Sequence, residues 1–329
     1  MDKTQASGLF RNLVGRSPAF KNVIAIANKI APHSIPVLIE GEIGTGKEWL
    51  ARAIHFASPR TSHEFIAIDC SSFSDVFLES ELLGYVRGSF AGAIHDKKGL
   101  LELADGGTVY LGHISKMALT LQGKLLRILN EGAFYKIGGV AEIHVDIRFI
   151  AATDQDLKAL VSKGKFREDL YYQLNVMRIT IPPLRERRED IPVLADWFLT
   201  EIAKRNGAPK KELTQEAQSI LNSYQWPGNV RELEREIEKS VILAGPNQKI
   251  GANDLTPVLS KRKRIPIDSK ILSSGSLKDQ KRKMIAVLER NAIQEALKQT
   301  AGNRTHAARL LAVSRQELLR KISLHKIKA

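Results

Sequence analysis

The sequence has a single cysteine, few aromatic residues and no long hydrophobic run. Cys70 alone excludes an internal disulfide framework and a zinc site built from several thiolates. The eight histidines show no metal-ligand spacing such as HxxxH, so no metal site is predicted. No apolar stretch approaches the ~18 residues of a membrane span, and the N-terminus lacks the hydrophobic core of a secretion signal. These absences predict a protein of the reducing cytoplasm without a membrane partner.

Positive charge is concentrated near the C-terminus. The whole chain carries a formal net charge of +14. Residues 261–329 hold 18 Lys and Arg against 5 Asp and Glu, whereas residues 1–260 hold 32 against 31. Charge gathered in this way is typical of a surface that binds a polyanion, although a solvated basic surface is the alternative. Aromatic residues make up only 6%, too few for a platform that stacks the bases of single strands.

Hydrophobic periodicity divides the chain into parts. Short β-rich runs at 36–39, 65–68, 108–111 and 147–150 alternate with helical stretches, which favours a parallel sheet with helices on its faces. Over residues 186–257 only helical periodicity is seen. Residues 258–278 are rich in Pro, Ser, Gly and charged side chains, a composition typical of a linker. The predicted parts are an N-terminal tail 1–14, an α/β part 15–185, a helical part 186–257, a linker 258–278 and a helical C-terminal domain 279–329.

A glycine-rich segment follows the first β-rich run and precedes a helical pattern. It reads GEIGTGKE over residues 41–48. Strand, glycine-rich loop and helix form the context in which backbone N–H groups and a lysine bind phosphate oxygens. A tight structural turn is the alternative interpretation. The candidate nucleotide-binding residues are Gly41, Gly44, Thr45, Gly46, Lys47 and Glu48.

The basic C-terminal domain has the pattern of a helix-turn-helix. A helical stretch at 284–298 is followed by Asn303, a good N-cap for a helix over 304–311. Ser314 with Glu317 predicts a capping box at the start of a last helix that runs to about Leu324. Such a module binds double-stranded DNA, whereas a helical hairpin used for dimerisation is the alternative. Arg315 and Gln316 are the candidate base-reading residues, and the candidate phosphate contacts are Arg304, Thr305, Arg320 and Lys321.

Six motifs now carry a family resemblance. They are GEIGTGKE, LESELLGYVRGSFAGA (78–93), LELADGGTVYL (101–111), FREDLYYQLNV (166–176), PPLRERREDIP (182–192) and WPGNVREL (226–233). In this order they resemble the AAA+ ATPase domain of bacterial enhancer-binding proteins, the activators of sigma-54 RNA polymerase, and the C-terminus resembles their Fis-type helix-turn-helix. The resemblance covers about residues 15–329. It implies an α/β fold in which an AAA+ parallel sheet with a phosphate loop carries a helical lid, followed by a small all-α DNA-binding domain.

The resemblance also implies roles for single residues. Arg231 matches the lid arginine that contacts the nucleotide, ATP or ADP. Arg167 matches the arginine finger that reaches into the site of a neighbouring subunit. The loop that contacts the polymerase has an apolar tip at Phe90, but Ala91 lacks the hydroxyl of the family's threonine, which is expected to weaken that contact. The residues of this loop are Gly88, Ser89, Phe90, Ala91, Gly92 and Ala93.

Several positions depart from the family pattern. Gly112 and His113 stand where the resemblance implies an Asp that helps to hold Mg²⁺ and a Glu that polarises the attacking water. Glu48 stands where Ser or Thr touches Mg²⁺, so the sequence gives only weak support for that ion. Asp69 stands where the resemblance implies an Asn that switches the catalytic Glu. Asp154 replaces the usual sensor Asn, and Gln173 replaces a second arginine finger. No intact catalytic set is predicted, and we expect a domain that binds nucleotide but hydrolyses it poorly or not at all.

The leading hypothesis is therefore a sequence-specific DNA-binding transcription regulator with an impaired ATPase domain. One alternative is a working sigma-54 activator whose hydrolysis uses unusual ligands. Another is a nucleotide sensor or scaffold, including a non-catalytic subunit in a mixed ring with an intact homologue. A homo-oligomer is expected, either a dimer or a hexamer. Since only about 14 residues precede the expected ATPase domain, we do not expect control by a receiver domain within this sequence.

Overall fold

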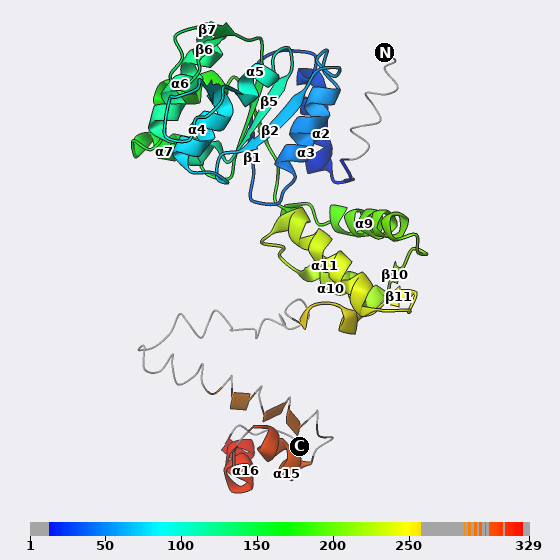
Figure 1. The fold of residues 1–329 in the computed structure, drawn as a ribbon. Helices are drawn as coiled ribbons and strands as arrows, with labels where there is room; N and C mark the ends of the chain where they lie inside the picture. Colours follow the sequence, from blue (N-terminus) through cyan, green and yellow to red (C-terminus); the bar gives the residue numbers. More distant parts are fainter. Residues whose placement is uncertain are drawn as a thin grey trace. The chain divides into compact units, whose positions relative to one another are not determined.

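The computed structural model of the chain divides into two compact units, residues 1–261 and residues 262–329 (Figure 1). It describes residues 13–257, 286, 289–290, 293–294, 296–297, 300, 303–311 and 313–324. The predicted linker, nearly all of the predicted tail and part of the first C-terminal helix lie outside the described residues. Within those residues, no helix combines the length and the apolar character that crossing a membrane requires.

A five-stranded sheet forms the centre of the first unit. Its strands lie in the order β2-β5-β8-β1-β9, and every pairing is parallel, which confirms the predicted sheet type. Sequence reasoning missed β9, an edge strand that pairs with β1. The strands are β1 (Val37–Glu40), β2 (Phe65–Asp69), β5 (Thr108–Gly112), β8 (Arg148–Thr153) and β9 (Met177–Thr180).

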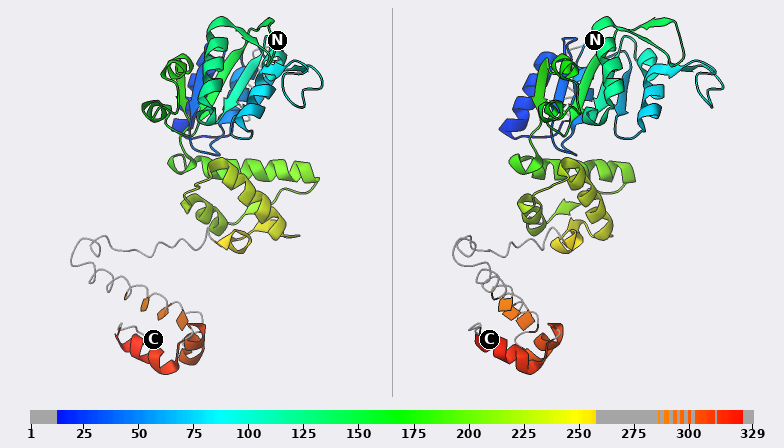
Figure 2. Two further views of the ribbon diagram at one scale, coloured as in Figure 1. Left: turned by 60° about the vertical axis from the view of Figure 1, so that its left-hand side comes forward. Right: turned by 90° about the vertical axis from the view of Figure 1, so that its left-hand side faces the viewer.

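Helices cover both faces of the sheet, as Figures 1 and 2 show. Side chains alternate along β1, so Val37 and Ile39 pack in the cluster with α2 and α3, whereas Leu38 packs with α4, α6 and α8 on the other face. Burial on both faces explains why the central strands read as continuous apolar runs. The helices are α2 (Pro18–Ile30), α3 (Lys47–Phe56), α4 (Asp75–Leu83), α5 (Leu100–Leu103), α6 (Leu119–Glu131), α7 (Leu157–Ser162) and α8 (Glu168–Leu174).

Two short antiparallel pairs stand apart from this sheet. β3 (Gly84–Tyr85) pairs with β4 (Lys97–Lys98), and β6 (Ala133–Tyr135) pairs with β7 (Glu142–His144). The N–H of Val86 donates to the carbonyl of Ile137 (3.1 Å), so the two hairpins are joined near their tips. One 3₁₀ helix, η1 (Ile114–Lys116), follows β5 directly.

The lid has its own core around Trp226, which is fully buried and donates to the carbonyl of Leu221. The expectation of helical structure alone over 186–257 is wrong in one respect. A short parallel pair, β10 (Glu212–Leu213) with β11 (Lys249–Ile250), joins the two ends of the lid. Two residues per strand are too few to give a period-two pattern. The other lid elements are η2 (Leu184–Glu186), α9 (Asp190–Asn206), α10 (Gln215–Ser223), α11 (Asn229–Leu243) and η3 (Ala252–Asp254).

The second unit contains α15 (Arg304–Leu310) and α16 (Arg315–Leu324). The side chain of Asn303 accepts from the backbone N–H groups of Thr305 and His306, which confirms the predicted N-cap. Ala307, Ala308 and Leu318 are buried where these helices pack. Small residues at this crossing let the two helices approach closely.

Candidate functional site: a phosphate loop beneath a helical lid

The loop over residues 41–46 connects β1 to α3 and packs against the lid. Gly44 and Gly46 both have positive φ, +79° and +100°, a region that costs side-chain-bearing residues energy. A Cβ on Gly44 would lie 2.1 Å from the carbonyl oxygen of Gly228, so only glycine fits there. The carbonyl of Gly44 accepts from the N–H of Val230 (2.9 Å), which joins the loop to the first turn of α11.

Lys47 is the first residue of α3 and is buried. Its Nζ donates to the carbonyls of Gly41 (2.6 Å) and Glu42 (2.9 Å), so the ammonium lies within the curve of the loop. Burial lowers the pKa of Lys47, and the negative charge of Asp154, just after β8, opposes that shift. A buried lysine at the start of a helix that follows a glycine-rich loop is well placed to bind phosphate oxygens.

A cavity of about 630 Å³ opens above this loop. Its walls come from the loop, α3, the ends of β2 and β5, and α11. Its volume lies within the ~300–1,000 Å³ usual for small-molecule sites. Eight of the residues singled out from the sequence line it: Gly44, Gly46, Lys47, Glu48, Asp69, Gly112, His113 and Arg231.

The two positions at which the resemblance implies contact with Mg²⁺ are occupied here by Gly112 and Glu48. Gly112 offers no side-chain ligand, and Glu48 pairs with Arg52 at 2.8 Å. Asp69 is bonded to Ser71 and His113. Among the described residues no group of three His, Cys, Asp or Glu side chains converges on one point. One carboxylate oxygen of Glu48 and one of Asp69 are therefore already paired.

Asp69 and His113 form one hydrogen-bonded pair. Oδ1 of Asp69 lies 2.9 Å from Nδ1 of His113 and also accepts from the N–H and hydroxyl of Ser71. Burial acts to raise the pKa of Asp69, but the hydrogen bonds from Ser71 and His113 outweigh it and hold the pKa below its ordinary value. The resemblance already relates the two positions, since it implies an Asn at position 69 that switches a catalytic Glu at position 113. The structure adds that the residues present, Asp69 and His113, are hydrogen-bonded to each other.

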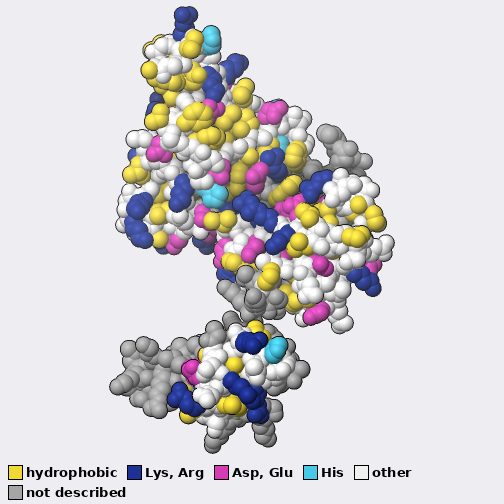
Figure 3. Space-filling model, turned by 60° about the horizontal axis from the view of Figure 1, so that its bottom comes forward, with side chains coloured by type: hydrophobic (Ala, Val, Ile, Leu, Met, Phe, Trp, Pro, Cys, Tyr) yellow, Lys and Arg dark blue, Asp and Glu magenta, His cyan; other side chains and the backbone are white. Residues whose placement is uncertain are grey.

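The six candidate DNA-binding residues lie on or beside α15 and α16. Arg304, Thr305, Arg315, Gln316 and Arg320 are exposed, whereas Lys321 is half-buried and pairs with Glu289 at 2.6 Å. Figure 3 shows Lys and Arg side chains spread over the visible face of this unit. Arg315 and Gln316 occupy the first turn of α16. In helix-turn-helix proteins, residues at the N-terminal end of the recognition helix contact base edges in the major groove.

Three family models match the chain in succession. The sigma-54 interaction domain matches residues 13–180, the AAA+ ATPase lid domain residues 185–270, and the Fis family of bacterial regulatory proteins residues 285–323. The chain belongs to the sigma-54-dependent enhancer-binding activators. The family assignment expected from the six motifs and the Fis-type C-terminus is confirmed.

Relatives of known function align along nearly the whole length of this chain. Regulatory protein AtoC of Escherichia coli is 43% identical over 314 residues, covering 94% of this chain and 67% of AtoC. The DNA-binding transcriptional regulator NtrC of Salmonella typhimurium is 40% identical over 333 residues, covering 97% and 71%. NtrX of Brucella abortus, solved in complex with ATP, matches with a TM-score of 0.68 at 30% identity and covers 95% of this chain and 69% of NtrX.

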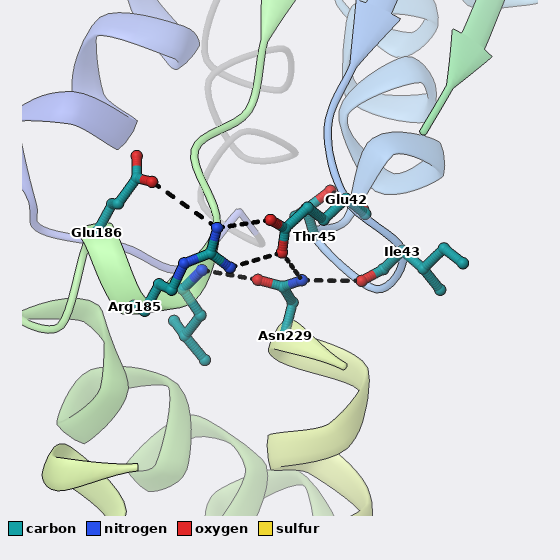
Figure 4. Close-up of polar contacts among 7 residues, drawn as sticks. Glu42, Ile43, Thr45, Arg185, Glu186 and Asn229 are labelled. Carbon is teal, nitrogen blue, oxygen red and sulfur yellow. Dashed lines mark hydrogen bonds and ion pairs between the residues drawn. The ribbon is translucent and has the colours of Figure 1, made fainter. Parts of the chain in front are cut away.

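In this chain a polar network joins the phosphate loop to the lid (Figure 4). Arg185 donates two hydrogen bonds to the carboxylate of Glu42, at 2.6 and 2.8 Å, and they hold the pKa of Glu42 below its ordinary value. The side-chain amide of Asn229 donates to Glu42 (3.1 Å) and to the carbonyl of Ile43 (2.9 Å), while its oxygen accepts from the N–H of Leu184 (2.7 Å). Both Arg185 and Asn229 lie in motifs that carried the resemblance, but their partners are distant in sequence.

Removing the Asn229 side chain is expected to lower the free energy of unfolding by about 1–3 kcal/mol. Asn229→Gly leaves the buried N–H of Leu184 without its acceptor, and glycine tolerates the φ of +53° found there. Asn247→Gly, at an exposed lid position, is the control and should change the free energy by less than about 0.5 kcal/mol. Urea titration measures both. Equal effects would contradict a specific role for Asn229.

Two further sequence candidates lie apart from the cavity lining. Arg167 is the N-cap residue of α8, is exposed, and pairs with Asp169 at 2.7 Å. Gln173 on the same helix lines a separate cavity of about 240 Å³ with Phe149. Neither borders the phosphate cavity of its own chain. Arg167 is thus exposed at the surface of its own chain, as a residue that reaches toward a neighbouring subunit would have to be.

The loop expected to contact the polymerase stands out from the α/β part (Figure 2, cyan). Gly88 and Gly92 have positive φ, and the N–H of Gly88 donates to the carbonyl of Ala93 (2.8 Å), which closes the loop on itself. Phe90 is 45% exposed, and its ring meets that of Tyr85 edge to face at 4.9 Å. Ser89 and Ala91 complete this turn. The ring of Phe90 at the tip is therefore partly exposed and packs against Tyr85, rather than projecting freely into solvent.

Proposed function

We propose that this activator-family chain is a DNA-binding transcription regulator whose ATPase domain binds ATP or ADP and hydrolyses it poorly. One observation carries the proposal: the cavity that brings Lys47 and Arg231 together has Gly112 and His113 at its catalytic wall. The solved complexes of NtrX with ATP and with ADP support nucleotide binding by the shared fold. A positioned general base alone contributes about 10²–10⁴-fold to a rate, so replacing a carboxylate pair slows hydrolysis greatly.

The experiment measures binding and turnover on one sample. Trp49 lines the cavity, so its fluorescence reports ATP binding, and release of labelled phosphate reports turnover. Saturable binding with slow turnover supports the proposal. Turnover at several per second, within the ordinary range for enzymes, would contradict impaired hydrolysis. Absence of binding would contradict the nucleotide site itself.

The C-terminal unit supports the DNA-binding part of the proposal. The Fis-family match spans both helices, and the exposed Arg315 and Gln316 are the proposed base readers. Arg304, Thr305 and Arg320 are the proposed phosphate contacts. Lys321 is already matched by Glu289, so its contribution should be smaller. Sigma-54 RNA polymerase is the proposed protein partner, through the loop tipped by Phe90.

Arg315→Ala is expected to relax base preference at one position of each DNA half-site by roughly 1–3 kcal/mol. Arginine bridges two acceptors of guanine, which alanine cannot. Arg304→Ala is the matched control and should weaken binding to all sequences about equally while lowering the salt slope by about one. Competition between a selected site and its single-base variants measures both. Uniform weakening by Arg315→Ala would make Arg315 a phosphate contact instead.

A further inference from the structure

The Asp69–His113 pair is built as a fixed unit. Three donors converge on Oδ1 of Asp69: the N–H of Ser71 (2.9 Å), its hydroxyl (2.7 Å) and the ring of His113 (2.9 Å). The backbone of His113 lies in the left-handed region at φ +51°, where non-glycine residues are uncommon. The carbonyl of His113 accepts from the N–H of Lys116 (2.8 Å), which closes this turn. Both ends of the pair are therefore held by the ends of neighbouring strands.

This geometry sets which ring nitrogen carries the proton. The Asp69 carboxylate, with its pKa held below the ordinary value, is ionised near neutral pH and can only accept hydrogen bonds. Nδ1 of His113 must then be the donor, which leaves the lone pair of the neutral ring on Nε2. Nε2 has no hydrogen-bond partner in the part of the chain that the structure describes. A histidine oriented by a carboxylate in this way is the arrangement of a general base.

The pair borders the cavity that also contains Lys47 and Arg231. These two cations are placed to stabilise the negative charge of a phosphate chain and of a departing phosphate. The charged residues that line the same cavity are Lys47, Glu48, Arg52, Asp69, Arg231 and Glu234. The lysine and arginines are cations that would bind the anion. Glu48 is paired with Arg52 and Glu234 lies on α11, whereas His113 follows β5 and has a carboxylate that orients its ring.

We propose that His113, oriented by Asp69, is the general base for the slow nucleotide hydrolysis of this chain. The inference rests on the proposed nucleotide binding. The oxygen of a water molecule forms a bond to the terminal phosphorus, and the bond from that phosphorus to the bridging oxygen breaks. The water proton passes to Nε2 of His113, and ADP leaves with the electron pair. The imidazolium then returns its proton to solvent, and the products are ADP and inorganic phosphate. Asp69 is a positioning residue in this scheme.

The test removes the imidazole ring of His113 by mutation and then adds free imidazole to the solution. His113→Gly deletes the base, and glycine accepts the positive φ, so the turn is retained. Single-turnover release of labelled phosphate is expected to fall about 100-fold. Added imidazole should restore at least a tenth of the lost rate and should leave the unaltered chain unchanged. In Asp69→Asn/His113→Gly, restoration should need a higher imidazole concentration, since the carboxylate that orients the ring is absent.

Each result separates this inference from the proposed function. Trp49 fluorescence is read for every variant, so failure of ATP to bind the unaltered chain counts against the nucleotide site. ATP binding with no turnover above that of Lys47→Ala would overturn the role of His113. Turnover that His113→Gly leaves unchanged, or loses without rescue by imidazole, would also overturn it. Rescue that needs the same imidazole concentration with and without Asp69 would remove Asp69 from the scheme.

Discussion

Lys47→Ala is expected to weaken ATP binding by about 10- to 100-fold. The Nζ of Lys47 is buried inside the phosphate loop and is held by the carbonyls of Gly41 and Glu42. A hydrogen bond to a charged group contributes about 1.5–3 kcal/mol, and each 1.4 kcal/mol is a factor of ten in affinity. Alanine removes both the charge and the donors. Titration of ATP against Trp49 fluorescence gives the affinity of each form.

A matched control tests whether the loss of affinity comes from the lysine in the loop or from the loss of any positive charge. Lys29 is exposed on the last turn of α2, and Lys29→Ala should leave the affinity unchanged. The loop itself is expected to keep its shape in Lys47→Ala, because Gly44 is held by α11 and Glu42 by Arg185 and Asn229. Equal affinity for Lys47→Ala and the unaltered chain would remove the phosphate loop from the nucleotide site.

The sequence was sufficient for the architecture because that information is local. Strand-loop-helix order around Lys47, the alternation over the first half of the chain, and the Asn303 cap all lie within short windows. The edge strand β9 escaped notice because four residues, MRIT, give no clear alternation. The β10–β11 pair was missed for the same reason, being two residues long on each side.

The contacts that shape the site are long-range, and the sequence does not encode them in any visible spacing. Asn229 lies 187 residues from Glu42, and Arg185 lies 143 residues from it. The Asp69–His113 bond spans 44 residues and depends on β2 and β5 being neighbours in the sheet. Composition and motif order identify such residues one at a time. The pairing of β2 with β5 shows that the residues at two of the departures from the family pattern, Asp69 and His113, contact each other directly.

This partnership changes how hydrolysis should be restored. Replacing His113 by Glu alone would place a second carboxylate beside Asp69, whose Oδ1 lies 2.9 Å from the ring it now holds. Like charges at that distance disfavour ionisation of one of the two groups. Asp69→Asn removes the conflict, since an amide can donate to the new carboxylate. The full reversion is therefore Asp69→Asn/Gly112→Asp/His113→Glu rather than the last two changes alone.

The triple variant is expected to turn over ATP at least ~100-fold faster than the unaltered chain in Mg²⁺-containing buffer. Gly112→Asp supplies a carboxylate of the kind that Mg²⁺ prefers, although its Cβ would lie 3.2 Å from the ring of Tyr110, which must shift by a few tenths of an ångström. Glu at position 113 must keep the positive φ that His113 already adopts, so little further backbone strain is expected there. Phosphate release and urea titration on the same sample separate these effects.

Two control variants test why turnover increases in the triple variant. Adding Lys47→Ala to the triple variant should abolish the gain, which ties it to the phosphate loop. Gly112→Asp/His113→Glu with Asp69 retained should gain much less, because its two carboxylates face each other. If the triple variant binds ATP, folds stably and shows no gain, the limiting departure lies elsewhere, at Asp154 beside Lys47 or at Gln173. If the pair without Asp69→Asn gains equally, the hydrogen bond between Asp69 and position 113 does not govern the chemistry.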